Sequence, residues 1–413
     1  MRNGFLLYVT GLFLALSCLP AYTQQPEPLG DAARRLRAEK EAASKSLDAA
    51  RAAALDPQKA DVLPHITTGP ITQLQLFTWL AAEMASEDLV FELHNRGIAF
   101  EPDDLFSENL ASVTTSASIA GAVHAARRTS DSQTTNSSAL SAIVSVGVSV
   151  KNHDYDEALL RMRPLFENDP QNPDLYFALG NIFKNLDYLD RETWALSRAV
   201  ELAPAFPYSH GQLSFAYYQM DDSEDAIREA RAMLKLVPNS SDAHKFLGLA
   251  FFVKNDYVDA TVEYTKALLL NPKNANVHYD VGVLWAAQNQ WEMAIPAYQK
   301  AISLETGRWF YYNNLGIALG HAGRVEEAVA TFQKGMAIAP GRPEILQSYG
   351  AMLCRSGSHE EAISVFSELL QANPEWNSAR PCLYNALMKM GRTEDAKKVK
   401  EDYIQYSPDH RPW

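Results

Sequence analysis

A proline that returns every 34 residues is the feature that most constrains this chain. The spacing is found in two runs, which are Pro204, Pro238 and Pro272, and then Pro340, Pro374 and Pro408. At position 306, where the ladder is interrupted, a threonine stands in its place. A period of this length indicates one supersecondary unit stacked on copies of itself. Each unit reads as two short amphipathic helices, and each proline ends the unit because proline cannot continue a helix.

Other positions recur in register when Pro204 is counted as slot thirty-two of its unit. Slot seven is large and apolar, slots eight and twenty are small, and slot twenty-four is mostly large or aromatic. Small residues at eight and twenty would let the two helices of a unit approach closely, and the large residues would fill the remaining space. The residues of slot eight are Gly180, Ser214, Gly248, Gly282, Gly316, Gly350 and Tyr384. Those of slot twenty-four are Leu196, Ala230, Tyr264, Tyr298, Phe332, Phe366 and Lys400.

This pattern resembles the tetratricopeptide repeat (TPR) family in its period and in its Leu-Gly, aromatic, Ala and Pro slots. The resemblance implies an all-α fold, a right-handed α-solenoid of helix-turn-helix repeats. Seven units run from Pro173 to Pro408, and a weaker one precedes them, closing at Pro170. The predicted array therefore covers 139–413 with about eight repeats. Terminal repeats depart from the pattern because one of their faces meets water.

The N-terminal segment 1–23 is predicted to be a secretory signal peptide. One early charge, Arg2, precedes the apolar run FLLYVTGLFLALSCL, and small residues follow near Ala21. The run is short for a membrane span. We therefore expect an exported protein, periplasmic or extracellular. A lipoprotein signal that anchors the chain at Cys18, or a retained signal anchor, is the alternative.

Between signal and array the sequence predicts a small helical module with linkers. Segment 24–70 combines a linker with an Ala-rich charged helix over 31–56, and 71–128 has apolar residues at helical spacing. Ser86 is a candidate N-cap, Gly97 a helix stop in a left-handed conformation, and Asp103 lies at another helix start. The polar run 129–138 is predicted to be a linker.

Charge and motifs indicate what the chain does not do. The formal charge of −13 disfavours sequence-independent nucleic-acid binding, which requires clustered Lys and Arg. The sequence has no phosphate loop, HExxH or GxSxG motif, so we expect no enzymatic activity, no cofactor, no metal and no small-molecule substrate.

His210, His244 and His278 share slot four, and they are interpreted as packing residues rather than metal ligands. Cys354 and Cys382 lie in neighbouring repeats; two thiols are expected, although export would permit a disulfide.

The resemblance implies that slots two, five, nine, twelve and thirteen line a concave groove. The middle of this groove is aromatic and aliphatic, which is typical of a protein or peptide site, although some of these side chains could pack against neighbouring helices or the N-terminal segment. The predicted groove residues are Phe177, Asn181, Tyr208, Phe215, Tyr218, Leu249, Phe252, Tyr279, Phe310, Asn313 and Ile317.

The resulting hypothesis is an exported, non-enzymatic scaffold that binds a protein or peptide partner in this groove. Two alternatives come from other classes. One is an envelope or outer-membrane assembly factor that is lipid-anchored at Cys18. The other is an enzyme, or a subunit of one, with a site hidden in 71–128, although that segment is short for a catalytic domain.

Overall fold

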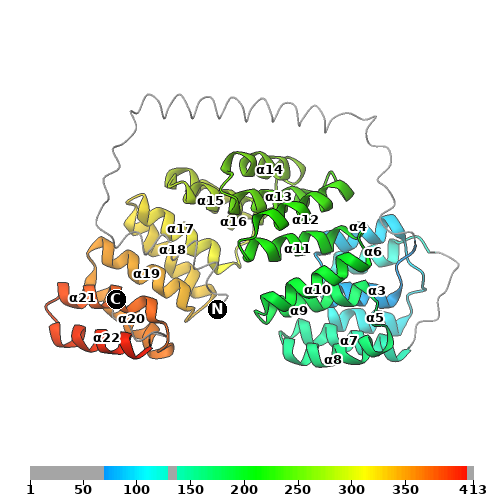
Figure 1. Cartoon of the computed structure of the whole chain (residues 1–413), viewed down its shortest axis with the longest axis horizontal. Coiled ribbons are helices and arrows are strands. Elements are labelled where there is room, and N and C mark those ends of the chain that lie inside the picture. The colour runs from blue at the N-terminus through cyan, green and yellow to red at the C-terminus, as the bar shows by residue number, and fades with distance from the viewer. Residues whose placement is uncertain (1–68, 129–136, 407–413) are drawn as a thin grey trace. The chain divides into compact units, whose positions relative to one another are not determined.

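The computed structural model describes residues 69–128 and 137–406. The predicted signal peptide, Cys18 and the predicted helix over 31–56 lie outside the described residues. Those that are described form an all-α fold (Figure 1) and divide into two compact units, 69–263 and 264–406. The helices are α3 (Gln73–Ala81), α4 (Ser86–Arg96), α5 (Asp104–Val113), α6 (Ala117–Ala125), α7 (Ser137–Lys151), α8 (Tyr155–Asn168), α9 (Pro173–Asn185), α10 (Leu189–Leu202), α11 (Pro207–Gln219), α12 (Ser223–Leu236), α13 (Ser241–Val253), α14 (Tyr257–Leu270), α15 (Ala275–Ala287), α16 (Trp291–Leu304), α17 (Trp309–His321), α18 (Val325–Ile338), α19 (Pro343–Ser356), α20 (His359–Ala372), the short 3-10 turn η1 (Asn377–Ala379), α21 (Arg380–Lys389) and α22 (Thr393–Tyr406).

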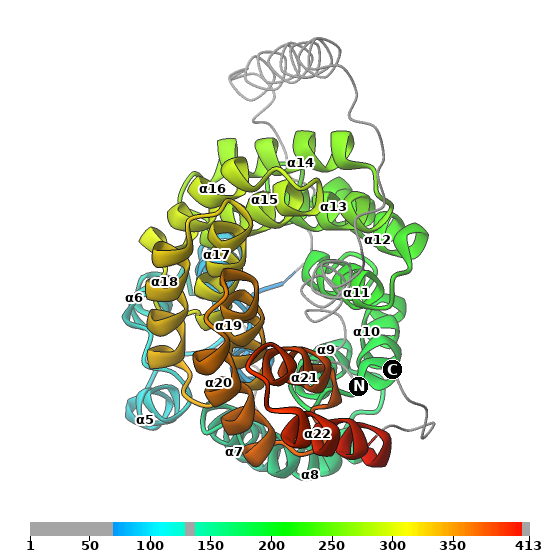
Figure 2. The ribbon, with the colours of Figure 1, turned by 90° about the vertical axis from the view of Figure 1, so that its left-hand side faces the viewer.

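From α7 onward the helices form the predicted pairs, with an odd-numbered first helix and an even-numbered second helix in each repeat. Figure 2 shows the arrangement in the second unit, where α17, α19 and α21 follow one another in one layer and α18, α20 and α22 in another. Each repeat is thus a helical hairpin that packs mainly on its sequence neighbours, which confirms the predicted solenoid architecture.

The small residues of slots eight and twenty act as predicted. A Cβ on Gly316 would lie 2.8 Å from the ring of Phe332, the slot-twenty-four residue of the same repeat. A Cβ on Gly180 would lie 2.6 Å from Leu196, which fills the same slot in its own repeat. At slot twenty, Ala328 is completely buried. The two helices of a hairpin therefore approach closely because these positions lack bulk.

The turn inside each hairpin contains a residue with positive φ, and this residue also recurs every 34 positions. It allows the backbone N–H of the next residue to bond back into the first helix, as Tyr188 N does to the carbonyl of Phe183 at 2.9 Å. Asp, Asn, His and Gly are the residue types that tolerate this conformation best. The positions are His153, Asp187, Asp221, Asn255, Asn289, Gly323, Gly357 and Gly391.

Slot four ties the first helix of a repeat to the proline turn before it. The Nε2 atoms of His210 and His278 lie 2.9 Å and 3.0 Å from the carbonyls of Pro204 and Pro272. Arg380 Nη2 donates to the Pro374 carbonyl at 2.6 Å in the same way. Proline leaves this carbonyl at the end of a helix, where an acceptor needs a donor from outside the helix. His210 and His278 are thus structural residues of the turns.

The N-terminal module consists of α3 to α6 and a set of short parallel bridges. Ile71 pairs with Ile98, and Ile98 with Arg128. Gly97 ends α4 with a φ of 71°, as predicted, but its ψ of −170° lies outside the left-handed helical region. A Cβ there would lie 2.2 Å from the Arg127 carbonyl oxygen, so the bridge admits only glycine.

The two predicted helix starts in the module have different outcomes. Asp103 caps α5, because its carboxylate accepts from Phe106 N at 2.7 Å. Ser86 was expected to cap α4 but is its first residue, and the cap position is occupied by Ala85 without a side-chain hydrogen bond. The acidic residues that follow, Glu87 and Asp88, lie in the first turn, at the positive end of the helix dipole.

Candidate functional site

The residues predicted to line the groove differ in their exposure. The buried ones are Phe177, Asn181, Tyr208, Leu249 and Asn313. The partly exposed ones are Phe215, Tyr218, Phe252, Tyr279, Phe310 and Ile317. All of them lie on first helices, α9 to α17, as the slot assignment requires. We call the layer formed by the first helices the inner face. The exposure of each residue depends on whether the N-terminal module or another side chain covers that part of the inner face.

The inner face of the first repeats is covered by the N-terminal module. The indole N–H of Trp79, on α3, donates to Asp174 Oδ1 on α9 at 2.6 Å, and Gln75 Nε2 donates to Asp174 Oδ2 at 3.0 Å. The Trp79 ring also stacks on Phe206, with centroids 5.5 Å apart. Phe206 in turn contacts the ring of Phe177 edge-on at 5.4 Å. Phe177 is therefore part of a core shared with the module.

A second set of polar contacts joins α4 to α11. The hydroxyl of Tyr208 donates to Glu92 Oε1 at 3.4 Å, and Arg96 Nη1 lies 3.5 Å from Glu92 Oε2. Burial raises the pKa of Glu92, and the charge of Arg96 opposes this effect. Burial likewise raises the pKa of Asp174 against the hydrogen bonds from Trp79 and Gln75. Both carboxyl groups lie in the contact between the module and the first helices of the array, Glu92 on the module and Asp174 on α9.

Asp88, also on α4, is a carboxyl group at the edge of the same contact. Burial and the nearby charge of Asp242, at the start of α13, raise the pKa of Asp88 to about 7. Lys245 acts in the opposite direction but is bound to Asp242, with Nζ and Oδ1 2.9 Å apart. The contact between the module and the repeats therefore holds an acid that titrates near neutral pH.

Beyond the module, the inner face of the first unit displays aromatic side chains. Phe215 and Tyr218 stack with ring centroids 5.5 Å apart. The ammonium group of Lys184 lies 4.9 Å from the centroid of the Phe215 ring and donates to Gln212 at 3.3 Å. On the following first helix, Phe252 lies 5.9 Å from the ring of Tyr257 and is partly exposed. We call the partly exposed side chains Phe215, Tyr218 and Phe252 the aromatic patch.

The inner face of the second unit has its own aromatic cluster. The ring of Tyr279 contacts Phe310 edge-on at 5.2 Å, and its hydroxyl accepts from Asn314 Nδ2 at 2.8 Å. Asn313 Nδ2 donates to Asn314 Oδ1 at 3.3 Å. Its own Oδ1 is buried without a hydrogen-bond partner in the described residues. Such an acceptor is costly to leave unpaired, and it lies beside partly exposed aromatic rings.

His321, at the end of α17, has a perturbed pKa because of its surroundings. Its ring stacks on Trp291 with centroids 4.1 Å apart, and Arg355 Nη1 lies 3.2 Å from its Nε2. Burial and the charge of Arg355 lower the pKa of His321 to about 4. The sequence did not identify Trp291 as a member of this stack, because it lies on a second helix.

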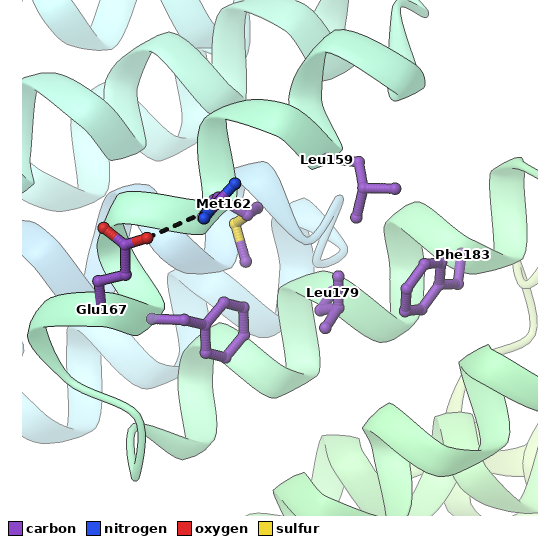
Figure 3. Close-up of a pocket in the computed structure, with 7 residues that line it drawn as sticks. Leu159, Met162, Glu167, Leu179 and Phe183 are labelled. Atoms are coloured by element: carbon purple, nitrogen blue, oxygen red, sulfur yellow. Dashed lines mark hydrogen bonds and ion pairs between the residues drawn. The ribbon is translucent and has the colours of Figure 1, made fainter.

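A hollow of about 420 Å³ lies between α8 and α9, and none of the predicted groove residues lines it. Figure 3 shows the side chains that do. Its lining is apolar except at Arg163 and Glu167, which form an ion pair of 3.1 Å. The lining residues all belong to these two helices. They are Leu159, Met162, Arg163, Phe166, Glu167, Leu179 and Phe183.

The histidines of slot four are engaged separately from one another. His210 Nδ1 lies 2.7 Å from Glu229 Oε2, and His244 Nδ1 lies 2.6 Å from Glu263 Oε2. Burial alone would lower the pKa of His210, but hydrogen bonds to Glu229 and to the Pro204 carbonyl raise it. Within 69–128 and 137–406, no group of three or more His, Cys, Asp or Glu side chains could hold a metal ion.

None of the described helices combines the length and apolar character needed to cross a bilayer.

Comparison with known families finds tetratricopeptide repeats at residues 216–264 and 311–342, and a PPR repeat at residues 351–373. These matches support a repeat protein of the tetratricopeptide type. Proteins built on such repeats are generally scaffolds for protein interactions. No curated protein matches the chain.

Among solved structures, the chain is similar to a chain of the APC/C hetero-tetramer Cut9-Hcn1, with 15% identity and a TM-score of 0.51. That match covers 60% of this chain and only 49% of the other. Pseudomonas aeruginosa pilF matches with 22% identity and a TM-score of 0.43, over 49% of this chain and 92% of that one. YrrB, a TPR protein with an unusual peptide-binding site, matches with 20% identity and a TM-score of 0.35, over 45% of this chain and 96% of that one. At 15% identity the similarity to the Cut9-Hcn1 chain shows the fold alone.

Proposed function

We propose that this protein is a non-enzymatic scaffold that binds a peptide or protein partner on the inner face of its repeats. The observation that carries the proposal is the aromatic patch of the first unit, where Phe215, Tyr218 and Phe252 remain partly exposed. Arrays with this repeat type generally bind proteins, and clustered exposed aromatic residues are typical of interaction hot spots.

The partner binds at the aromatic patch and not at the first repeats, because the module covers the inner face there. Phe177 and Tyr208 are 2% and 8% exposed, so they offer no surface to a partner while the module is in place. Phe215 presents a ring face that carries the ammonium group of Lys184 at 4.9 Å. In the second unit, Tyr279, Phe310 and Ile317 offer a further partly exposed stretch. Apolar side chains of the partner would provide most of the binding energy at both.

Export to the cell envelope is part of the proposal. It is supported by the apolar run of segment 1–23, which has the layout of a signal peptide. Cell fractionation together with N-terminal sequencing of the purified protein tests it. A mature N-terminus near residue 22 or 24 in the envelope fraction is expected, and an intact Met1 in the cytosol would contradict export.

The binding proposal is tested by a pull-down from envelope extract with the full chain and with Phe215→Ala/Phe252→Ala. The full chain is required because Trp79 and Asp174 join the module to the first repeats, so an array beginning at residue 139 would expose part of a core. The double variant is expected to weaken partner binding at least about tenfold, because each truncated anchor costs about 2 kcal/mol.

A matched control is Leu160→Ala/Trp194→Ala, which removes two apolar side chains that are 69% and 53% exposed on second helices. It should retain the partner. Circular dichroism and elution volume establish that both variants are folded. Equal capture by the wild type and by the folded patch variant would contradict the assignment of the patch.

A further inference from the structure

In two places in the array, slot twelve of one first helix contacts slot six of the next. In the first unit this pair is Lys184 and Gln212, whose side chains are hydrogen-bonded at 3.3 Å. The two residues are 28 positions apart in sequence. The same spacing and the same slots are occupied in the second unit by Cys354, on α19, and Cys382, on α21.

The two cysteines are therefore neighbours in space. Cys354 Sγ lies 3.8 Å from the backbone carbonyl oxygen of Cys382. Both are thiols in the structure, and both side chains are partly exposed. A disulfide requires Cα atoms within about 7 Å of each other, and the contact of one sulfur with the backbone of the other cysteine is in keeping with that range.

The helices that carry the cysteines are held together beside them. Ser378 Oγ, in η1, donates to Gln347 Oε1 on α19 at 2.8 Å, and the indole N–H of Trp376 donates to the same oxygen. Arg380 Nη2 fixes the start of α21 to the Pro374 carbonyl at 2.6 Å. These hydrogen bonds hold the start of α21 close to α19 beside the two cysteines.

We propose that Cys354 and Cys382 are a redox-active pair that forms a disulfide between the last two repeats. In the presence of a low-molecular-weight disulfide such as glutathione disulfide, one thiolate attacks the reagent and releases one thiol. The second thiolate then attacks the protein mixed disulfide and releases the other thiol. The two protein thiols are oxidised, one disulfide reagent is reduced to two thiols, and the two protein protons end on these thiols.

The position of the pair gives the bond a structural effect. The hairpin of α21 and α22 follows α20 at the C-terminal end of the described array, and end repeats of a solenoid open most easily because they have one neighbour. A covalent bond from α21 to α19 would hold this hairpin on the array. The inference does not depend on the proposed function or on export, because the reaction requires only the two thiols and an oxidant.

The test uses the full chain with Cys18→Ser, so that two thiols remain. After incubation with glutathione disulfide, intact mass should fall by two hydrogen atoms. Tryptic mapping should show peptide 335–355 joined to peptide 356–389, because Arg342 and Arg380 precede proline and are poor cleavage sites. Hydrogen exchange in α21 and α22 should then be slower in the oxidised form than after reduction.

A displaced pair provides the matched control. Cys382→Ser/Met388→Cys moves one thiol along α21 to a position that is 44% exposed, and closure should be slower by about tenfold or more because the effective concentration of the thiols falls. Lys184→Cys/Gln212→Cys, in a chain without other cysteines, tests the register and should close like the native pair. Glutathione adducts on both native thiols, or cross-linked dimers, without the internal disulfide would overturn the proposal, as would equal rates for the native and displaced pairs.

Discussion

Trp79 donates its indole N–H to a carboxylate oxygen of Asp174, 2.6 Å away, across 95 residues of sequence. This bond joins the N-terminal module to α9, the first helix of a repeat. The module thereby covers the inner face at that repeat. The predicted groove is therefore shorter than the sequence indicated, because the module covers its N-terminal part, which includes Phe177 and Tyr208.

Replacing Asp174 should therefore destabilise the contact between module and array. In Asp174→Ala the indole N–H of Trp79, which is completely buried, loses its acceptor, and we expect a loss of about 1–3 kcal/mol in the free energy of unfolding. Urea unfolding followed by tryptophan fluorescence measures it. Asp190→Ala, at an exposed position of α10, is the control and should change stability by less than about 0.5 kcal/mol. Equal midpoints for the two variants would contradict the role of Asp174.

Overpacking a slot-twenty alanine should separate the helices of one hairpin. Ala328 is completely buried beside the first helix of its repeat, so Ala328→Leu is expected to cost about 1–3 kcal/mol. Thermal unfolding measures the loss. Ala330→Leu adds the same side chain to an exposed position of α18 and should leave the midpoint nearly unchanged. A destabilisation of equal size in both would show that leucine acts through something other than the hairpin contact.

The pair of His210 and Glu229 predicts a loss of stability on the alkaline side. The pKa of His210 is raised above its usual 6.5 in the folded protein, so its contribution is complete below that value and is lost as pH rises through the raised pKa. Burial alone would raise the pKa of Glu229, but hydrogen bonds from His210 and Arg228 lower it below 4.5, so its contribution persists until pH falls through that lowered value.

Urea midpoints measured from pH 5 to 9 should show this alkaline decline in the wild type and a smaller one in His210→Gln. His94→Gln changes an exposed histidine of the module and should keep the wild-type profile. An identical pH profile for the wild type and His210→Gln would contradict the prediction.

Asp88 predicts a second pH effect at the edge of the module. Its pKa is about 7 in the folded protein and 3.8 in the reference state, so the folded form favours the proton and loses stability as pH rises from 3.8 through 7. Asp88→Asn removes this loss and should raise the urea midpoint at pH 8 relative to the wild type. Glu87→Gln, at an exposed neighbour, should not do so. A lower midpoint for Asp88→Asn would show that the carboxylate stabilises the contact.

The repeat architecture could be predicted because its causes are local and recur. A proline, a glycine facing an aromatic ring and an alanine at slot twenty each act within one repeat, so position in the period is sufficient to assign their contacts. Gly316 and Phe332 illustrate this, since the predicted slots meet in the structure. The hydrogen bonds from slot four to the proline turns are also periodic, but they depend on side-chain direction, which the pattern of residue types does not show.

The covering of Phe177 and Tyr208 could not be assigned from the sequence. An apolar residue on a first helix is exposed or covered depending on how the N-terminal module packs on the first repeats. The sequence of each of these two parts indicates only amphipathic helices. Trp79 looked like any core residue of α3. The contact of Cys354 with Cys382 has the same spacing of 28 residues as that of Lys184 with Gln212, so it could be assigned only once one such contact was known from the structure.

The positive φ that recurs in every hairpin turn also determines how the array tolerates mutation. A β-branched residue in place of Asn255 or Asp221 would strain one turn and leave the hydrogen bonds of every other hairpin in place. Damage of this kind stays within one repeat and its two neighbours. An array with such turns can therefore accumulate substitutions one hairpin at a time, and its surface can diversify without a simultaneous change in the rest of the chain.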